Sequence, residues 1–459
     1  MKKRNFVVFV LVLAVMFCAT ACKPNILEKP DDEYSVNLTV DKNITETLTL
    51  MIPSNDGDVE RNYITSLIPG FKELYPNVTI KFDARPISDD KYAESVSAAI
   101  ASQNVPDLFW TNTLFYYYLI AKNCVVSLEP YYRAEKEAGT LDLEGEYYEA
   151  FFNMSTYQDK RYIVPRSMDS VVTYFNTEIL EAAGIDYKTD QRMSNSWTWA
   201  DLESLCKQVS DFILSEEGKT LGYSSYYALQ PEFSWEAVFN PVMLSYGSQV
   251  FADNGDVTID SPETVEMANM IRGLKEEGRV LRDSTSGSTF TNGKVAFTFS
   301  SSGPSNMALH AQISDKFDAL PFPLIGDNPK IGCGFVGYGI SSTTEGVKRD
   351  LAWQFLRYMI SKKGQMELIN GGLATPSIRV DLAEEKEWSK GFSHLNLDAW
   401  LVGEKYKVCS NFYTKHDPAC SFDILRAIQN LMNNLTDSTK SVERCVEECK
   451  SDLQEAISQ

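Results

Sequence analysis

The stretch that decides the fold runs from Leu48 to Phe82 and reads LTLMIPSNDGDVERNYITSLIPGFKELYPNVTIKF. Its two ends, 48–52 and 78–82, are short and rich in β-forming residues. Between them apolar residues recur at the spacing of one helix face, at Ile64, Leu67, Ile68, Phe71 and Leu74. The stretch therefore predicts a strand–helix–strand unit whose helix bends or splits at Pro69 and Gly70.

A second helix and a third strand extend this unit. Apolar positions within 92–100 follow helical spacing, and "DLFW" at 107–110 has the composition of a buried strand. Ligands of such sheets gather at the carboxyl ends of the strands. We therefore expect Trp110 and Thr113, at the end of the third strand, and Asn55 and Asp56, after the first, to face a ligand. The aromatic run 116–118 cannot point one way on a helix, so packing is expected for most of it.

Length and charge limit the architecture and the partners. A chain of 459 residues, 44% of them hydrophobic, is long enough for two cores. A formal net charge of -20 disfavours nucleic acid and anionic membrane surfaces as partners. With three histidines and nine irregularly spaced cysteines, we expect no metal site, no cofactor and no disulfide framework.

The N-terminus has the pattern of an export signal. Basic residues at 2–4 precede an apolar run over 6–17, and "ATAC" ends at Cys22. This pattern resembles a bacterial lipobox, so residues 1–21 are expected to be removed and Cys22 to carry lipid, although cleavage without lipid is the alternative. Residues 22–45 have the composition of a flexible tether. The protein is expected outside the cytoplasm, anchored to the cell membrane.

Local signals also predict the start of a helix in "SWTWADLESL" at 196–205. Ser196 or Thr198 can cap this helix, and Asp201 suits its first turn. Trp199 is therefore expected to be structural.

The order of several segments resembles one family. These segments are "FKELYPNVTIKF", "SAAIASQNVPDLFW", "SWTWADLESLCKQV", "FTNGKVAFTFSSSGP" and "GYGISSTTEGVKRDLAWQFLRYMISKKGQMEL". Together they resemble the extracellular solute-binding proteins of bacterial ABC transporters, family 1, which includes the maltose-binding proteins. The resemblance covers nearly the whole mature chain.

The resemblance implies a two-lobed α/β fold of the periplasmic-binding-protein type, class II, with mixed sheets flanked by helices and a hinge of three crossovers. Lobe 1 would comprise 46–165 and 338–375, and lobe 2 would comprise 166–337 and 376–459. The protein would be a monomer without enzymatic activity. It would close on a carbohydrate, with an oligosaccharide favoured, and deliver it to the permease subunits of an ABC importer.

The resemblance also implies a set of ligand-binding residues. Sugars are bound by flat aromatic faces and by planar polar groups. Arg166 is either a ligand contact or the partner of Asp169, and Tyr338 serves either hinge packing or the ligand. Phe422 makes either a ligand contact or a buried helix contact. The positions taken as ligand-binding are Asn55, Asp56, Trp110, Thr113, Arg166, Asp169, Glu232, Trp235, Ser302, Tyr338, Phe422 and Arg426.

Alternatives to this function stay open. Ser305 stands where the family often has tryptophan, which disfavours a maltodextrin ligand. The same fold could bind a polyamine or a glycerophosphodiester. A secreted carbohydrate-active enzyme would need two carboxylates about 5 to 10 Å apart in a cleft, and the sequence shows no catalytic motif.

Overall fold

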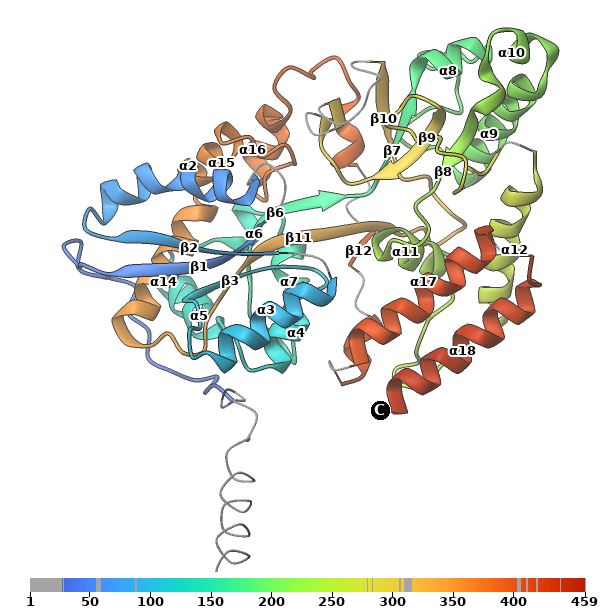
Figure 1. Cartoon of the computed structure of the whole chain (residues 1–459). Coiled ribbons are helices and arrows are strands. Elements are labelled where there is room, and N and C mark those ends of the chain that lie inside the picture. Colours follow the sequence, from blue (N-terminus) through green and yellow to red (C-terminus); the bar gives the residue numbers. More distant parts are fainter. Residues whose placement is uncertain are drawn as a thin grey trace, which may run out of the picture.

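Two α/β lobes make up the computed structural model, and two long strands run between them (Figure 1). The arrangement confirms the predicted fold class. The structure describes residues 27, 29–54, 59–86, 89–278, 280–282, 284–304, 307–308, 316–402, 406–409, 412–417, 420–437 and 439–458.

The sheet of lobe 1 is mixed. Three strands are parallel in the order β2–β1–β3, β11 is antiparallel to β3, and β6 is antiparallel to β11. The short strand β12 continues the sheet beside the first residues of β11. Helices α2 and α15 lie on one face, with α3 on the other (Figure 1). The bounds are β1 Thr47–Ser54, α2 Val59–Leu74, β2 Thr79–Pro86, α3 Asp89–Ala101, β3 Leu108–Asn112, β6 Val164–Ser170, β11 Ile331–Ile340, α15 Lys362–Asn370 and β12 Lys407–Val408.

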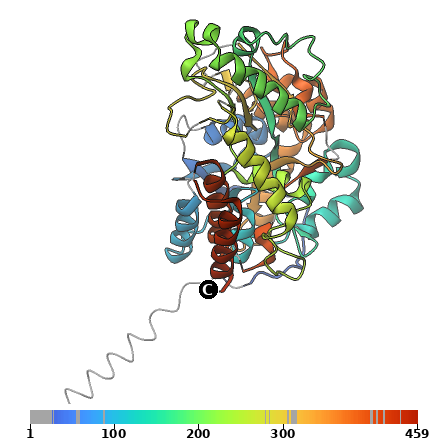
Figure 2. The ribbon, with the colours of Figure 1, turned by 90° about the vertical axis from the view of Figure 1, so that its right-hand side faces the viewer.

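The sheet of lobe 2 has the order β10–β7–β9–β8. Successive residues of a strand point to opposite faces. Phe175 accordingly contacts Phe297 on one face, while Tyr174 contacts Trp400 on the other, with ring centroids 6.5 and 5.7 Å apart. Figure 2 shows α17 and α18 paired beside α12 on the outside of this lobe. The bounds are β7 Val172–Asn176, α9 Trp199–Leu214, β8 Tyr227–Gln230, α11 Glu236–Ser245, α12 Pro262–Glu276, β9 Val295–Ser300, β10 Phe317–Pro321, α17 Ser421–Asp437 and α18 Val442–Ser458.

The chain first passes between the two sheets at three places, and it later returns to the lobe 1 sheet in β12 before α17. It crosses first at Val171, between β6 and β7, and again over 322–330, between β10 and β11. A third crossing follows α15 and leads to the helical turn Leu397–Trp400, which packs on β10. The predicted lobe bounds after 165 and before 338 fall inside β6 and β11, and they stay a prediction.

Other helices and strands are α4 Tyr116–Ala121, α5 Glu129–Ala138, α6 Leu143–Glu146, α7 Glu149–Asn153, β4 Thr156–Tyr157, β5 Lys160–Arg161, α8 Thr177–Ala182, α10 Glu216–Thr220, α14 Gly346–Ile360 and α16 Val380–Glu385.

Helix α2 is one continuous helix, so it does not split at Pro69, and the alternative of a bend there stays a prediction. Tertiary packing offsets the hydrogen bond that proline removes. At Gly70 the helix lies so close to α14 and α15 that an added Cβ would be 1.8 Å from the Tyr358 hydroxyl and 2.3 Å from Glu367 Oε1. The missing side chain therefore permits the close packing.

Helix α9 begins with a reciprocal cap. The Asp201 amide donates to Thr198 Oγ1 (3.3 Å), and the Thr198 amide donates to Asp201 Oδ2 (2.8 Å). Of the two candidate caps, Thr198 is the one used. Trp199 is buried against Phe299, as predicted.

We expect Thr198→Ala to lower the free energy of unfolding by about 1 kcal/mol, since it leaves one amide at the helix start without its acceptor. Urea denaturation measures the change. Ser196→Ala is the matched control, because the Ser196 hydroxyl bonds only the neighbouring Ser194 hydroxyl in the described structure. Equal losses in both variants would contradict the assignment of the cap.

The described part of the predicted tether lies along lobe 1. The Tyr34 hydroxyl donates to the Ser127 carbonyl (2.6 Å), and Lys160 Nζ lies 2.7 Å from Asp32 Oδ2. The Tyr34 ring also lies under the Arg349 guanidinium, 4.3 Å from its centroid. Because its aromatic and acidic side chains find partners there, residues 29–45 are held on lobe 1, so the expectation of a flexible tether is wrong for them. Cys22 and the signal segment 1–21 lie outside the described residues.

Candidate functional site

Three strands bring Thr113 and Asp169 together at the lobe interface. On β11, Gly334 pairs with Asp169 of β6, and the Phe335 amide donates to Thr113 Oγ1 (3.0 Å). A Cβ on Gly334 would lie 2.7 Å from Thr113 Oγ1 and 2.9 Å from Asp169 Oδ1. The glycine thus lets two predicted ligand-binding groups approach from either side of one strand.

Asp169 is contacted from both lobes. Burial raises the pKa of its carboxyl group. Hydrogen bonds from the Ser301 hydroxyl, the Gly334 amide and its own backbone amide, together with the charge of Lys407, oppose that shift. Ser301 follows β9 of lobe 2, whereas Gly334 belongs to the lobe 1 sheet. The side chain is only partly buried, so it can accept hydrogen bonds from a ligand between the lobes.

We expect Gly334→Ala to weaken ligand binding by about 1.5 kcal/mol, the value of one hydrogen bond to a charged group, because the new methyl group displaces Asp169. Gly273→Ala is the control, since no atom lies within 4 Å of a Cβ at that position. Calorimetric titration measures both. Unchanged affinity in Gly334→Ala would show that Thr113, Asp169 and Gly334 do not form part of the ligand site.

Arg166 and Tyr338 meet on a third side chain. Arg166 Nη2 donates to Glu60 Oε2 (2.9 Å), and the Tyr338 hydroxyl donates to Glu60 Oε1 (2.8 Å). All three side chains are buried, and the guanidinium lies 5.0 Å from the centroid of the Tyr63 ring. The ion pair of Arg166 is with Glu60, so the expected pairing with Asp169 is not formed. The three residues connect α2, β6 and β11 at the hinge.

The aromatic predictions Trp110 and Phe422 converge on Phe115. The Phe115 ring centroid lies 6.3 Å from that of Trp110 and 6.2 Å from that of Phe422. Trp110 itself is 7% exposed, and its ring also contacts Tyr92. Phe422 begins α17 of lobe 2, so the aromatic contact spans the two lobes. The run 116–118 is buried, which confirms packing as its role.

The remaining predictions lie on lobe 2. Glu232 has a positive φ of 50°, and its Oε1 accepts a hydrogen bond from the side-chain amide of Gln230. Trp235 precedes α11, which packs on β11, and the ring is half-buried. Ser302 accepts from the Tyr174 hydroxyl through its carbonyl. Arg426 is exposed and pairs with Asp423 (2.9 Å).

Two predicted residues, Asn55 and Asp56, lie outside the described residues. Within the part of the chain that the structure describes, every helix is too short or too polar to cross a lipid bilayer. The same part holds no cluster of three histidine, cysteine or carboxylate side chains suited to a metal ion.

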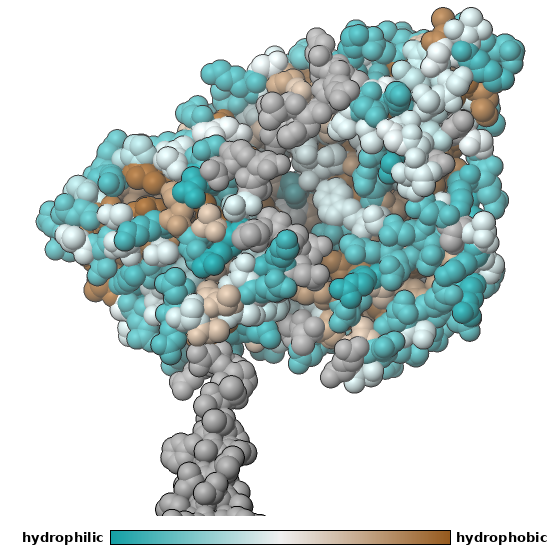
Figure 3. All heavy atoms as spheres, viewed as in Figure 1, coloured by the Kyte–Doolittle hydropathy of each residue, from teal (hydrophilic) through white to brown (hydrophobic). Residues whose placement is uncertain are grey.

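A cavity of about 500 Å³ opens where the lobes meet. Figure 3 shows the surface hollowed between the lobes, within a mostly hydrophilic outer face. Thr113 lines this cavity. Because Thr113 and Asp169 both lie against Gly334, the cavity adjoins Asp169. The walls of the cavity come from both lobes. Lobe 1, with its edge strand β12, supplies Thr113, Tyr116, Asn153, Met154, Thr156, Tyr157, Gln158, Lys407, Val408 and Cys409. Leu244 belongs to α11 of lobe 2, and Thr414 lies in the turn Phe412–Lys415, which contacts α17.

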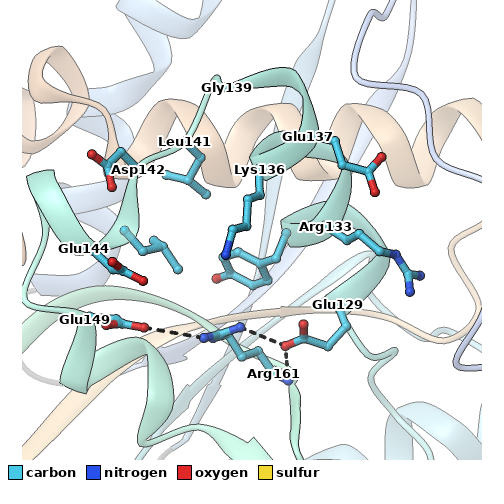
Figure 4. A pocket seen from close by; sticks show the side chains of 12 residues that line it. Glu129, Arg133, Lys136, Glu137, Gly139, Leu141, Asp142, Glu144, Glu149 and Arg161 are labelled. Atoms are coloured by element: carbon cyan, nitrogen blue, oxygen red, sulfur yellow. Dashed lines mark hydrogen bonds and ion pairs between the residues drawn. The ribbon is translucent and has the colours of Figure 1, made fainter.

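A larger pocket of about 730 Å³ lies on lobe 1 alone. Figure 4 shows Arg161 between Glu149 and Glu129 on its floor, with the labelled acids and bases around its rim. None of the predicted ligand-binding residues lines it. We place the candidate site between the lobes because groups of both lobes contact Asp169 there.

Sequence reasoning missed Glu60, Ser301 and Lys407. Glu60 stands in the first turn of α2, where an acid is also expected as a partner of the helix dipole. Ser301 belongs to the quoted "SSSGP" segment, yet only the fold brings its hydroxyl to Asp169. Lys407 follows no recognisable motif.

Comparison with known proteins gives the family model of bacterial extracellular solute-binding proteins, which matches residues 67–392. An arabinooligosaccharide-binding protein of Halalkalibacterium halodurans is 27% identical over 129 residues, which are 28% of this chain and 25% of that protein.

Solved structures of binding proteins share the fold. An ABC substrate-binding protein of Listeria monocytogenes in complex with cycloalternan has a TM-score of 0.69 at 18% identity, over 90% of this chain and 100% of that chain. UgpB of Mycobacterium tuberculosis in complex with glycerophosphocholine has a TM-score of 0.70 at 16% identity, over 90% and 98%. Identities this low show the fold alone.

Proposed function

Because the chain belongs to the bacterial extracellular solute-binding proteins, we propose that it captures a carbohydrate, with an oligosaccharide favoured, between its lobes. The closed protein then delivers the sugar to the permease of an ABC importer, and lipid on Cys22 anchors it to the membrane. Binding without chemical conversion is the whole mechanism. A ligand that contacts both lobes stabilises the closed form by its differential affinity for that form.

The observation that carries the proposal is the position of Asp169. Its carboxylate lies between the lobe 1 groups Thr113 and Gly334 and the lobe 2 hydroxyl of Ser301. A carboxylate of this kind accepts hydrogen bonds from adjacent sugar hydroxyls. The half-buried Trp235 offers an aromatic face on lobe 2 for a pyranose ring.

The second candidate is a glycerophosphodiester, and the likeness to UgpB supports testing it. The charges near the site argue against it. Arg166 is already paired with Glu60, and Asp169 would repel a phosphate. Lys407 is a cation near Asp169, and its charge already acts on that carboxylate.

A thermal-shift screen of residues 23–459 tests the function. Panels of mono- and oligosaccharides are compared with glycerophosphocholine and a polyamine. A ligand at 100 times its dissociation constant adds about 2.7 kcal/mol to the unfolding free energy, so the midpoint must rise. We expect a shift with one sugar class and no release of reducing sugar. A shift with glycerophosphocholine or the polyamine alone would overturn the carbohydrate, and sugar release would indicate an enzyme.

A further inference from the structure

Three sulfur atoms from distant parts of the chain meet beside the interlobe cavity. The Cys409 Sγ lies 3.0 Å from the Met154 Sδ, and the Cys333 Sγ lies 3.9 Å from the same Sδ. The Cys409 thiol also lies 3.4 Å from the Cys333 carbonyl oxygen. We call Met154, Cys333 and Cys409 the sulfur cluster.

The fold explains how these residues meet. Strand β12 pairs in parallel with the start of β11, Ile331 opposite Lys407 and Gly332 opposite Val408. The next position on each strand is a cysteine, so Cys333 and Cys409 are neighbours across the ladder. Met154 directly follows α7 and reaches both thiols. No sequence spacing connects the three positions.

The sulfur cluster can be reached from the cavity. Met154 and Cys409 line the cavity wall together with Lys407, while Cys333 is buried behind them. Hydrophobic packing alone is the ordinary reason for cysteine and methionine to be buried together. Two thiols and a thioether at one point of a solvent-accessible cavity are also the donor set that a soft metal ion selects.

We propose that the sulfur cluster binds one Cu(I) ion. With metal–sulfur bonds of about 2.3 Å, the length of zinc–thiolate bonds, the sulfurs of a trigonal site lie about 4.0 Å apart. The Cys333 Sγ and the Met154 Sδ are already 3.9 Å apart. The Cys409 Sγ, now 3.0 Å from the Met154 Sδ, has to move outward by about 1 Å.

Each thiol releases its proton to solvent as its metal–sulfur bond forms, and Cu(I) with two thiolates and one thioether has a net charge of minus one. The charged groups nearby are the Lys407 ammonium in the same cavity wall and the Asp169 carboxylate, whose charge acts on the Cys409 thiol. The neighbouring Cys333 thiol and burial raise the pKa of Cys409 in the metal-free protein. Because protons are released, binding weakens as the pH falls.

The experiment is an anaerobic titration of the reduced mature domain with Cu(I), in competition with the chelator bicinchoninate and without sugar. We expect one Cu(I) per chain in the wild type and three sulfur ligands at about 2.3 Å in X-ray absorption. Met154→Leu and Cys409→Ser should each lower the affinity by about 100-fold or more, since even changes behind the ligands cost about 10- to 100-fold. Cys206→Ser is the control, because Cys206 is buried in α9 of lobe 2.

Met154→Leu preserves volume and apolar character, so it keeps the test valid if a cysteine variant fails to fold. Equal copper affinity in wild type, Met154→Leu and Cys409→Ser would overturn the proposal. So would a Cys333–Cys409 disulfide in air-purified protein together with no copper uptake by the reduced protein, since the pair would then be a redox crosslink. Failure of sugar binding has no bearing on this result.

Discussion

Replacing Glu60 with glutamine should lower the free energy of unfolding by about 3–5 kcal/mol, the cost of leaving a buried charge without its partner. Glu60 accepts from both Arg166 and Tyr338, and the side chains of the ion pair are each 5% exposed. The change leaves the guanidinium buried without a carboxylate and loosens α2 from β6 and β11. Urea denaturation measures the loss.

Two further variants test whether the loss comes from the unpaired buried charge. The double variant Glu60→Gln with Arg166→Met should recover part of the loss, because no unpaired charge remains. Asp211→Ala removes an ion pair with Lys207 that is exposed on both sides, and it should leave stability unchanged. A loss below about 1 kcal/mol in Glu60→Gln would show that the network contributes little.

Replacing Asp169 with asparagine should weaken carbohydrate binding by about 1.5–3 kcal/mol, or roughly tenfold to 150-fold. The substitution preserves the shape of the side chain but removes the charge that strengthens its hydrogen bonds to sugar hydroxyls. Calorimetric titration with the sugar found in the screen measures the effect. Asp318→Asn is the matched control, because Asp318 is a half-buried carboxylate on β10, and burial likewise raises its pKa.

The pH dependence separates the charge of Asp169 from its shape. Burial raises its pKa above the ordinary aspartate value, and only the ionised form accepts hydrogen bonds with both oxygens. Binding should therefore weaken as pH falls through the raised pKa, and Asp169→Asn should be flat there. The stability of the ligand-free protein has the opposite pH dependence to ligand binding. Since the folded-state pKa exceeds the unfolded one, the contribution of Asp169 to stability declines as pH rises through that window.

The sequence predicted what depends on local patterns and segment order. The helical spacing before Leu74, the cap at Thr198 and the buried run 116–118 follow from neighbouring residues, and the structure confirms them. The resemblance of ordered segments identified the two-lobed fold, which the comparisons bear out.

Pairings between distant segments could not be predicted. Glu60 and Arg166 are 106 positions apart, and Cys333 and Cys409 are 76 apart. The packing of α2 against β6 brings the first pair together, and the register of β11 and β12 brings the second. The continuous course of α2 through Pro69 and the docking of Tyr34 on lobe 1 depend likewise on packing partners that no local pattern contains.

Small-angle X-ray scattering tests the central claim, that ligand binds between the lobes, most directly. The mature domain is measured with and without a saturating amount of the sugar that shifts its melting temperature. We predict a smaller radius of gyration with sugar, since a ligand held by both lobes favours the closed form. An unchanged radius at full occupancy would contradict the account and would direct attention to the pocket on lobe 1 around Arg161 and Glu129.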